Sequence, residues 1–285
     1  MNNLSHHVIA EIEKIVGKDH LCLDKEDLLC YAFDATKTVA VPAAVIFPGD
    51  ARQVSEILKL ANQYGFSVTP RGAGSGMTGG AVPVRHGVVL AMSRFNHILS
   101  IDRDNLIARV EPGVVTGVFQ KAVEQMGLFY PPDPSSSDFS TLGGNAAECA
   151  GGPRAVKYGV TRDYVLGMTV VLPTSEIIRT GVQTGKGVVG YDLTRLMVGS
   201  EGTLGVITEL TLRLLPKPEA VRTLMAVYDR INAATETVSE IIRRGIIPRT
   251  IEFMDNASIR CAEAYAKSGL PVDAEALLII EVDGG

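Results

Sequence analysis

The chain lacks the cysteine patterns that hold metal clusters or cross-link small secreted folds. Its four cysteines are Cys22, Cys30, Cys149 and Cys261. They are scattered and form no C-x-x-C pair, so zinc sites, iron–sulfur clusters and structural disulfides are not expected, and buried thiols in a reducing cytoplasm are the simplest interpretation. The five histidines are isolated apart from His6-His7, which falls in a segment that we expect to be an exposed helix. No metal site is therefore predicted.

Excess positive charge and long apolar runs are also missing. Lysine and arginine number 27 against 32 acidic residues, a net charge of −5, so a nucleic-acid partner is not expected. No apolar run is long enough to cross a bilayer, and Met1–His7 has no basic-then-apolar signal pattern. With 46% hydrophobic and 21% charged residues, the 285-residue chain is typical of a globular protein with two domains, or one and part of another.

What the chain does have is a glycine-rich stretch, Pro70–Gly80, with five glycines in eleven residues. Such a sequence does not form a regular helix or strand, but its backbone can turn several N–H groups toward one point and hold an anion such as pyrophosphate. Arg71 adds a guanidinium, and Ser75 and Thr78 add hydroxyl donors. We expect an anion-binding loop rather than a mobile surface loop, because strand-like residues 66–69 lead into it.

Two familiar nucleotide motifs are excluded by their context. Gly74–Gly79 matches the spacing G-x-G-x-x-G, which indicates a dinucleotide site only where a helix follows directly. Residues 81–87 show no helical periodicity and contain Pro83. Gly181–Gly187 has the wrong spacing for a Walker A loop and no Ser or Thr after its lysine.

Hydrophobic periodicity predicts helices and strands on both sides of the glycine-rich stretch. Expected helices lie at residues 4–16, 24–31, 50–65 and 117–126, the third capped by Asp50 and stopped by Gly65, the fourth capped by Thr116. Expected strands lie at residues 42–48, 66–69, 87–91, 97–102, 106–111, 165–172, 177–179 and 206–215. Beyond a boundary at Pro216–Pro218, a βαβαβ pattern follows, with strands at 221–228, 250–254 and 276–282 and helices at 232–244 and 256–267.

Three further blocks point to a ligand. Residues 130–138 are rich in proline and hydroxyl groups and are expected to be rigid and extended. Residues 141–153 carry two Gly-Gly pairs around a short helix, whose N-terminus we expect to face a bulky group at close range. Gly202 and Gly205 stand near the head of a strand, which indicates close backbone approach by a ligand.

Four motifs in this order, PRGAGSGMTGG, PPDPSS, TLGGNAAECAGGPRAVKYG and EGTLGVIT, resemble the flavin domain of the vanillyl-alcohol-oxidase-type FAD enzymes. The resemblance is to the branch that contains the FAD-carrying D subunit of glycolate oxidase and the D-lactate dehydrogenases. It implies an α+β fold, in which two α/β subdomains form a PCMH-type FAD-binding domain over residues 1–215. The segments IPRTIEFMDN and LLIIEVDGG are similar to the first part of a ferredoxin-like α/β cap domain, here residues 216–285, which we expect to be truncated C-terminally.

The resemblance also implies FAD in an extended form, with its pyrophosphate at the glycine-rich stretch. The residues that it implies for FAD binding are Pro70, Arg71, Gly72, Ala73, Gly74, Ser75, Gly76, Thr78, Pro132, Asp133, Pro134, Ser135, Ser136, Thr141, Leu142, Gly143, Gly144, Asn145, Ala147, Glu148, Gly151, Gly152, Tyr158, Gly159, Glu201, Gly202, Gly205, Val206 and Ile207. Members that bind FAD covalently often have His in place of Ser75, so non-covalent FAD is expected. The family commonly has Asn in place of Cys149, which we interpret as a tolerated exchange.

No catalytic base can be named, because the family's substrate clamp and histidine-rich segment belong to a later part of the cap domain. Arg94, Arg154 and Lys157 are candidates to lie near the flavin and stabilise its reduced form, and equally candidates for surface ion pairs.

The resemblance implies an FAD-dependent oxidoreductase that oxidises a 2-hydroxy acid such as glycolate or D-lactate by hydride transfer to flavin N5. Electrons would pass to an iron–sulfur partner subunit or a quinone chain, with at most peripheral membrane association through that partner. An alternative is a non-catalytic FAD-binding or scaffold subunit whose shortened cap serves subunit contacts. An NADPH-using reductase on the same flavin fold has little support, because no further nucleotide motif is visible.

Overall fold

The computed structural model describes residues 4–184 and 186–284. Met1–Asn3, Gly285, and Gly185 inside the segment compared with a Walker A loop lie outside the described residues. The chain forms two compact units. The first consists of residues 1–130, 134–150 and 161–216, and the second of residues 131–133, 151–160 and 217–285.

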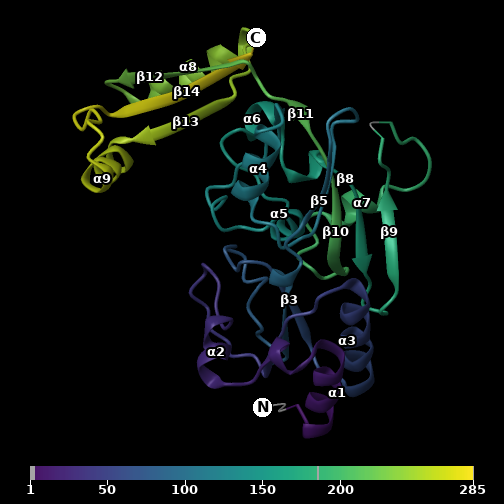
Figure 1. Cartoon of the computed structure of the whole chain (residues 1–285). Helices are drawn as coiled ribbons and strands as arrows, with labels where there is room; N and C mark the ends of the chain where they lie inside the picture. The colour runs from purple at the N-terminus through teal and green to yellow at the C-terminus, as the bar shows by residue number, and fades with distance from the viewer. Residues whose placement is uncertain (1–3, 185, 285) are drawn as a thin grey trace. The chain divides into compact units, whose positions relative to one another are not determined.

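The first unit begins with a small, mainly parallel sheet in the order β1-β2-β4-β3. Its strands are β1 (Leu21–Cys22), β2 (Ala44–Ile46), β4 (Val88–Ala91) and β3 (Val68–Arg71), with β1 antiparallel to β2. Helices α1 (His6–Val16) and α3 (Ala51–Tyr64) bury one face each in a core shared with this sheet (Figure 1). The predicted caps of α3 are confirmed, because Asp50 Oδ1 accepts from Gln53 N at 2.9 Å and Gly65 is left-handed with φ 71°.

A second, antiparallel sheet completes this unit in the order β5-β6-β10-β8-β9. Its strands are β5 (Ile98–Asp102), β6 (Ile107–Val110), β10 (Val206–Arg213), β8 (Val165–Val171) and β9 (Ile177–Gly181). Val171 and Val206 belong to the same buried cluster as α1, α3, β2 and β4. One hydrophobic core therefore joins the two sheets.

Short elements connect these sheets. They are α2 (Lys25–Cys30), α4 (Thr116–Glu124), β7 (Leu128–Phe129), α5 (Leu142–Glu148), α7 (Leu193–Met197) and β11 (Leu215–Pro216). The predicted capping role of Thr116 is wrong. Thr116 is the first residue of α4, after the N-cap Val115, and its buried hydroxyl donates to Ser140 O at 3.0 Å instead.

The second unit contains a three-stranded antiparallel sheet in the order β12-β14-β13 (Figure 1). Its elements are β12 (Ala220–Tyr228), α8 (Ile231–Arg243), β13 (Thr250–Asp255), α9 (Asn256–Ala266) and β14 (Ala276–Gly284), with the short helix α6 (Ala155–Tyr158) from the excursion at 151–160. Alternate residues of β14 serve two cores, since Leu278 packs with Ala234 of α8 while Leu277 packs with Ile259 of α9.

Polar contacts join residues 151–160 to this sheet within the second unit. Asp283 on β14 has a fully buried side chain, which is ion-paired with Lys157 and accepts from Tyr158 Oη at 2.7 Å. Arg249 lies 3.6 Å from the same carboxylate. Burial of Asp283 opposes ionisation, but the donors Lys157 and Tyr158 outweigh it and lower the pKa of Asp283.

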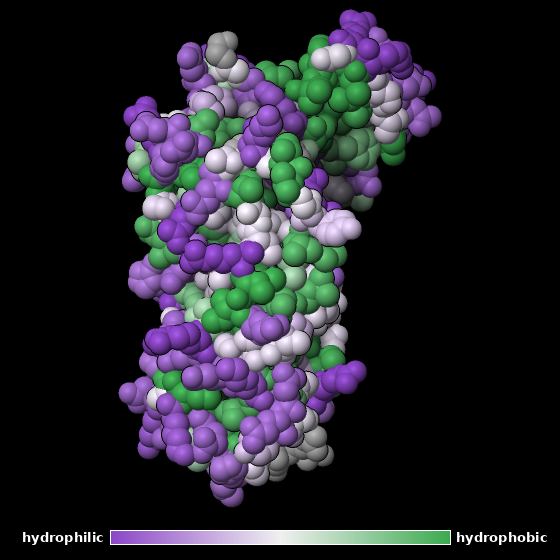
Figure 2. Space-filling model, turned by 90° about the vertical axis from the view of Figure 1, so that its right-hand side faces the viewer, coloured by the Kyte–Doolittle hydropathy of each residue, from purple (hydrophilic) through white to green (hydrophobic). Residues whose placement is uncertain are grey.

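The surface is mixed in character. On the face drawn in Figure 2, hydrophobic patches lie among hydrophilic side chains. The expectation of buried thiols is wrong for Cys30 and Cys261, which are exposed. No helix of the described residues is long and apolar enough to cross a membrane. Within residues 4–184 and 186–284, no group of three or more His, Cys, Asp or Glu side chains is arranged to hold a metal ion.

The Asp283 contacts generate a stability prediction. Replacing Asp283 with Ala removes the carboxylate that Lys157 and Arg249 share, while Arg249 keeps its pair with Glu281 at 3.7 Å. Because that pair remains and Lys157 is partly solvated, we expect a loss of about 1–3 kcal/mol in the free energy of unfolding. Replacing Asp163 with Ala, which removes an exposed ion pair with Arg195, should cost less than about 1 kcal/mol. Urea unfolding of both variants measures this; equal losses would contradict the assigned role of Asp283.

Candidate functional site

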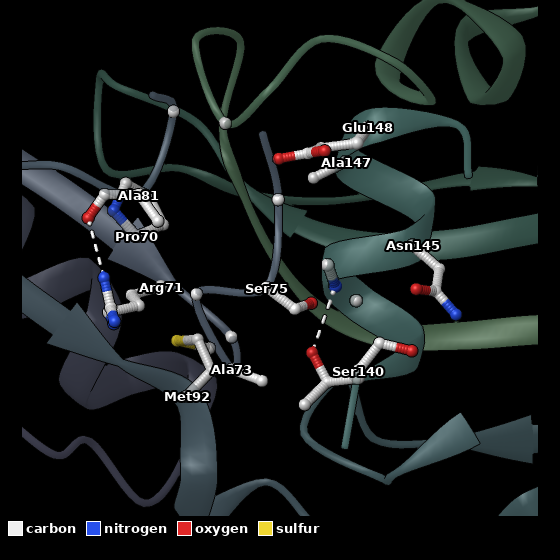
Figure 3. A pocket seen from close by; sticks show the side chains of 18 of the residues that line it. Pro70, Arg71, Ala73, Ser75, Ala81, Met92, Ser140, Asn145, Ala147 and Glu148 are labelled. Carbon is white, nitrogen blue, oxygen red and sulfur yellow. Dashed lines mark hydrogen bonds between the residues drawn. The ribbon is translucent and has the colours of Figure 1, made fainter. Parts of the chain in front are cut away.

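A cavity of about 310 Å³ opens in the first unit beside the glycine-rich stretch. Four segments supply most of its lining: the glycine loop (residues 70–81), residues 135–136, residues 140–148 with α5, and residues 201–207 at the head of β10. Figure 3 shows the glycine loop passing between the strand β3 that delivers it and the helix α5. The three glycine-rich blocks of the sequence therefore meet at one place.

The glycine loop presents backbone donors that the protein itself does not use. Among the described residues, no backbone N–H from Ala73 to Gly79 donates a hydrogen bond to another protein group. Gly74 and Gly79 have positive φ values of 69° and 83°, so the loop includes left-handed turns that reorient successive N–H groups. This is the geometry of an anion-binding nest.

Close contact between glycines brings the loop against α5. A side chain at Gly72 would overlap Thr141 Oγ1 and would lie 3.7 Å from the Cα atom of Gly144. A side chain at Gly143 would overlap Pro112 on the far side of the helix start. These glycines are required by packing.

The N-terminus of α5 lines the cavity, but its first backbone N–H groups form hydrogen bonds within the protein. Leu142 N donates to Val114 O at 2.9 Å, and Gly143 N donates to Pro112 O at 2.7 Å. Gly144 N donates to Thr141 Oγ1 at 3.2 Å. Because neighbouring segments already accept from these groups, the donors facing the cavity come from the glycine loop and from hydroxyl groups.

A buried hydroxyl and amide network fixes the wall beside α5. Asn145 Nδ2 donates to Thr116 Oγ1 at 2.7 Å, and that hydroxyl lies 2.9 Å from Ser140 Oγ. The three side chains are at most 4% exposed. The network ties the cavity wall to α4 and holds Ser140, whose hydroxyl the sequence did not single out.

Glu148 closes the other side of the loop. Its carboxylate lies directly against the Cα atom of Gly76, where any side chain would overlap it, and it accepts from Thr78 Oγ1 at 3.3 Å. Unlike Gly74, Gly76 does not have a positive φ, so its requirement is the space that the Glu148 carboxylate occupies.

The electrostatics of this rim disfavour a charged Glu148. Partial burial raises the pKa of Glu148, and the neighbouring carboxylates of Glu201 and Asp34 raise it further, against the hydrogen bond from Thr78. Glu201 lines the same cavity and is held by its N–H, which donates to Ala147 O at 2.8 Å. The site thus combines unpaired backbone donors with a carboxylate that is readily protonated.

Arg71 does not extend an unbound guanidinium into the cavity. Arg71 is 6% exposed as a residue; its guanidinium donates from Nη1 to Ala81 O at 3.2 Å and lies under Gly74, where any Cβ would overlap it. Figure 3 shows this bond and shows Ser75 on the opposite side of the loop, directed toward the wall with Ser140 and Asn145. Arg71 lines the base of the cavity and Ser75 its interior.

Several predicted residues lie elsewhere. Those that do not line the cavity are Thr78, Pro132, Asp133, Pro134, Leu142, Gly151, Gly152, Tyr158 and Gly159; every other predicted cofactor residue lines it. Six of the nine belong to the second unit. There, Gly152 packs against the backbone of Asp133, where a side chain would overlap it.

The three candidate cations are all engaged in protein contacts and none lines the cavity. Arg94 Nη1 donates to Phe47 O at 2.9 Å, Arg154 Nε lies 3.2 Å from Asp133 Oδ2, and Lys157 pairs with Asp283. Arg154 and Lys157 therefore form ion pairs, as one of the two alternatives predicted. These are not surface pairs, since their carboxylate partners are mostly buried.

The sequence missed part of the lining. The additional residues are Met77, Gly80, Ala81, Met92, Pro112, Ser140 and Ala150. The place of Met92 could have been predicted from the sequence. It directly follows β4, the parallel neighbour of β3, and parallel strands end at the same sheet edge. Pro112 and Ser140 reach the cavity through contacts between distant segments, which no local pattern reveals.

Two protein families match the chain. The family described as FAD binding domain matches residues 42–181, and the family described as FAD linked oxidases, C-terminal domain, matches residues 217–285. The chain is 48% identical to the glycolate oxidase subunit GlcD of Bacillus subtilis over 282 residues, 99% of this chain and 60% of that protein. It is 40% identical to a D-lactate dehydrogenase of Anaerostipes hadrus over 251 residues, 86% of this chain and 53% of that protein.

Among solved structures, an alkyldihydroxyacetonephosphate synthase superposes with a TM-score of 0.86 at 24% identity, covering 99% of this chain and 56% of that one. This likeness shows the fold. The chain spans only about half to three fifths of the length of these relatives.

Two glycines of the loop allow a matched test. Gly74→Ala and Gly79→Ala each place a side chain at positive φ and should each lower the free energy of unfolding by roughly 1–2 kcal/mol. Only Gly74→Ala also displaces Arg71, because nothing lies within 4 Å of a side chain at Gly79. We expect Gly74→Ala to weaken FAD binding about tenfold or more relative to Gly79→Ala in a fluorescence titration. Equal affinities would contradict the packing described for Gly74.

Glu148 generates a pH prediction. The pKa of Glu148 is raised in the native state above its ordinary value of 4.5. Between these two values, the carboxyl is protonated in the native state and ionised in the unfolded state. This contribution to stability is present at low pH and declines as pH rises through that window. Glu148→Gln should remove this part of the slope when urea unfolding is measured from pH 4.5 to 8. Superimposable pH profiles of the wild type and the variant would refute the assignment.

Proposed function

Because the chain belongs to the FAD-linked oxidases, with their FAD-binding domain at residues 42–181 and their C-terminal domain at 217–285, we propose that it is the FAD-carrying polypeptide of a 2-hydroxy-acid oxidoreductase. FAD is its cofactor, and its mixed α and β fold is of the PCMH type. The substrate class is inferred from the relatives, which are named for glycolate and D-lactate, both 2-hydroxy acids.

The observation that carries the proposal is the fit between the cavity and a long diphosphate cofactor. The N–H groups of residues 73–79 lack protein acceptors among the described residues, and glycines leave the loop open to close approach. A diphosphate supplies the acceptors that these donors need. The cavity also extends from the loop past Ser135, Ser136 and Ser140, along which an elongated ligand would lie.

Each part of the wall has a distinct role in this proposal. The loop N–H groups would bind the diphosphate, while the hydroxyl groups of Ser75, Ser140 and Thr141 would orient the remainder of the cofactor. Met92, Pro112 and Ile207 give apolar surface that would exclude water. FAD, when bound, supplies the two-electron acceptor; the protein's contribution is binding, orientation and electrostatics.

We propose that FAD is held without a covalent bond. Ser75, which lines the cavity at the position where covalent members of the resembling family often have His, is a poor candidate for a flavin linkage. Acid precipitation of the purified protein should leave the yellow colour in the supernatant. Colour that pellets with the protein would indicate covalent attachment.

Domain roles follow from the same comparison. We propose that residues 1–215 act as the FAD-binding domain and residues 216–285 as part of a substrate cap. Because the relatives include a protein named as a subunit, we also propose that the chain works with a partner subunit in the cytoplasm and that an iron–sulfur partner receives its electrons.

Anaerobic reduction tests the proposed function. The chain loaded with FAD should show the oxidised flavin spectrum, and in a form extended to the length of the relatives glycolate or D-lactate should bleach it, whereas L-lactate should not. The same substrates should support turnover with a dye acceptor. If FAD binds but no 2-hydroxy acid reduces it, the result would favour the scaffold alternative. If the protein does not bind FAD, the proposal is overturned.

A further inference from the structure

A segment that precedes the family-matched region lies under the glycine loop. Residues 31–36 follow α2 and end before residue 42, where the match to the FAD binding domain begins. Ala35 N donates to Gly76 O at 3.1 Å, so this segment is bonded directly to the loop backbone. Neither Tyr31 nor Asp34 belongs to any of the glycine-rich motifs.

Tyr31 supports the buried cation of the loop. The Arg71 guanidinium carbon lies 5.6 Å from the centroid of the Tyr31 ring, within the range of a cation–π contact. The ring itself is held edge-on by Phe47, with centroids 5.8 Å apart. Tyr31 is thereby fixed as one wall of the space that Arg71 occupies.

Asp34 supplies the opposite charge. It is 5% exposed, and its Oδ1 accepts from Thr36 N at 2.9 Å and from Thr36 Oγ1 at 2.5 Å. Its Oδ2 is buried and has no hydrogen-bond partner among the described residues. Burial lowers the pKa of Arg71, and Tyr31 and Asp34 act against that decrease, although no hydrogen bond or ion pair joins Asp34 to Arg71 among the described residues.

Burying a guanidinium is costly unless a counter-charge and specific contacts compensate for it. Here the contacts come from the Tyr31 ring and Ala81 O, and Asp34 contributes a buried negative charge without a direct bond to Arg71. The guanidinium in turn fills the space beneath Gly74, where no side chain fits. Contacts from residues 31–35 therefore reach the loop at two points, the Gly76 carbonyl and the underside of Gly74.

We propose that Tyr31 and Asp34 are positioning residues for the cofactor: they hold Arg71 beneath Gly74 and so keep the glycine loop in the form whose N–H groups face the cavity. They act through Arg71 and do not contact the ligand. This inference rests on the proposed function only in that FAD is the ligand of the loop.

The test is FAD titration of the full chain, stripped of flavin, with Tyr31→Leu, Tyr31→Phe and Asp34→Asn. Tyr31→Leu removes the aromatic ring, and we expect about fivefold or greater loss of FAD affinity. Tyr31→Phe keeps the ring and should stay within about twofold of the wild type. Asp34→Asn keeps the shape but removes the charge, and should weaken binding by about tenfold.

Matched controls separate positioning from general damage. Tyr64→Leu removes a tyrosine whose ring has a similar edge contact, with His7 at 5.8 Å, away from the cavity. Asp102→Asn alters an aspartate that also accepts from a residue farther along its own turn, Asn105. Neither control should change FAD affinity by more than about twofold.

A double-mutant cycle supplies the readout that a purely structural role would not move. In an Arg71→Met background, Tyr31→Leu should cause no further loss of FAD affinity, because its effect passes through Arg71. Full additivity would overturn the proposal, as would unchanged affinity in both Tyr31→Leu and Asp34→Asn. If Tyr31→Leu does not fold, Asp34→Asn in the same two backgrounds decides the question. Failure of the wild type to bind FAD would instead refute the proposed function.

Discussion

The cavity depends on backbone that approaches other groups without side chains between them. Gly72 packs on Thr141 and Gly144 of α5, and Gly74 lies over a buried guanidinium. Gly76 touches the carboxylate of Glu148. A methyl group would press the loop away from Thr141 at Gly72, and would displace the end of the Arg71 side chain at Gly74 and of the Glu148 side chain at Gly76. The same lack of side chains leaves the loop N–H groups accessible, so packing and ligand binding impose the same requirement on the sequence.

The charges around the loop are arranged in layers. A cation, Arg71, lies buried beneath it, while the carboxylates of Glu148 and Glu201 lie at the cavity rim. A buried positive charge under the N–H groups favours an anion above them without taking one of its coordination sites. The rim carboxylates oppose that anion unless they are protonated or hydrogen-bonded, and the raised pKa of Glu148 makes protonation easier.

Local signals predicted most elements, because they depend on neighbours in sequence. Asp50 and Gly65 bound α3 as predicted, and the glycine spacing identified the loop. The errors concern contacts between distant segments. The Thr116 hydroxyl donates to Ser140 O instead of capping α4. The Arg71 side chain lies under the loop, where its guanidinium contacts the Tyr31 ring. Nothing in the local pattern shows that residues 131–133 and 151–160 leave the first unit for the second.

The most direct test of the central claim is amide hydrogen exchange of the loop, measured with and without FAD. The account predicts that FAD slows exchange most strongly over residues 73–79, because these N–H groups have no protein acceptor among the described residues and gain one from the diphosphate. ADP, which carries the diphosphate without the flavin, should protect the same residues. Tight FAD binding with unchanged exchange over residues 73–79 would contradict the account.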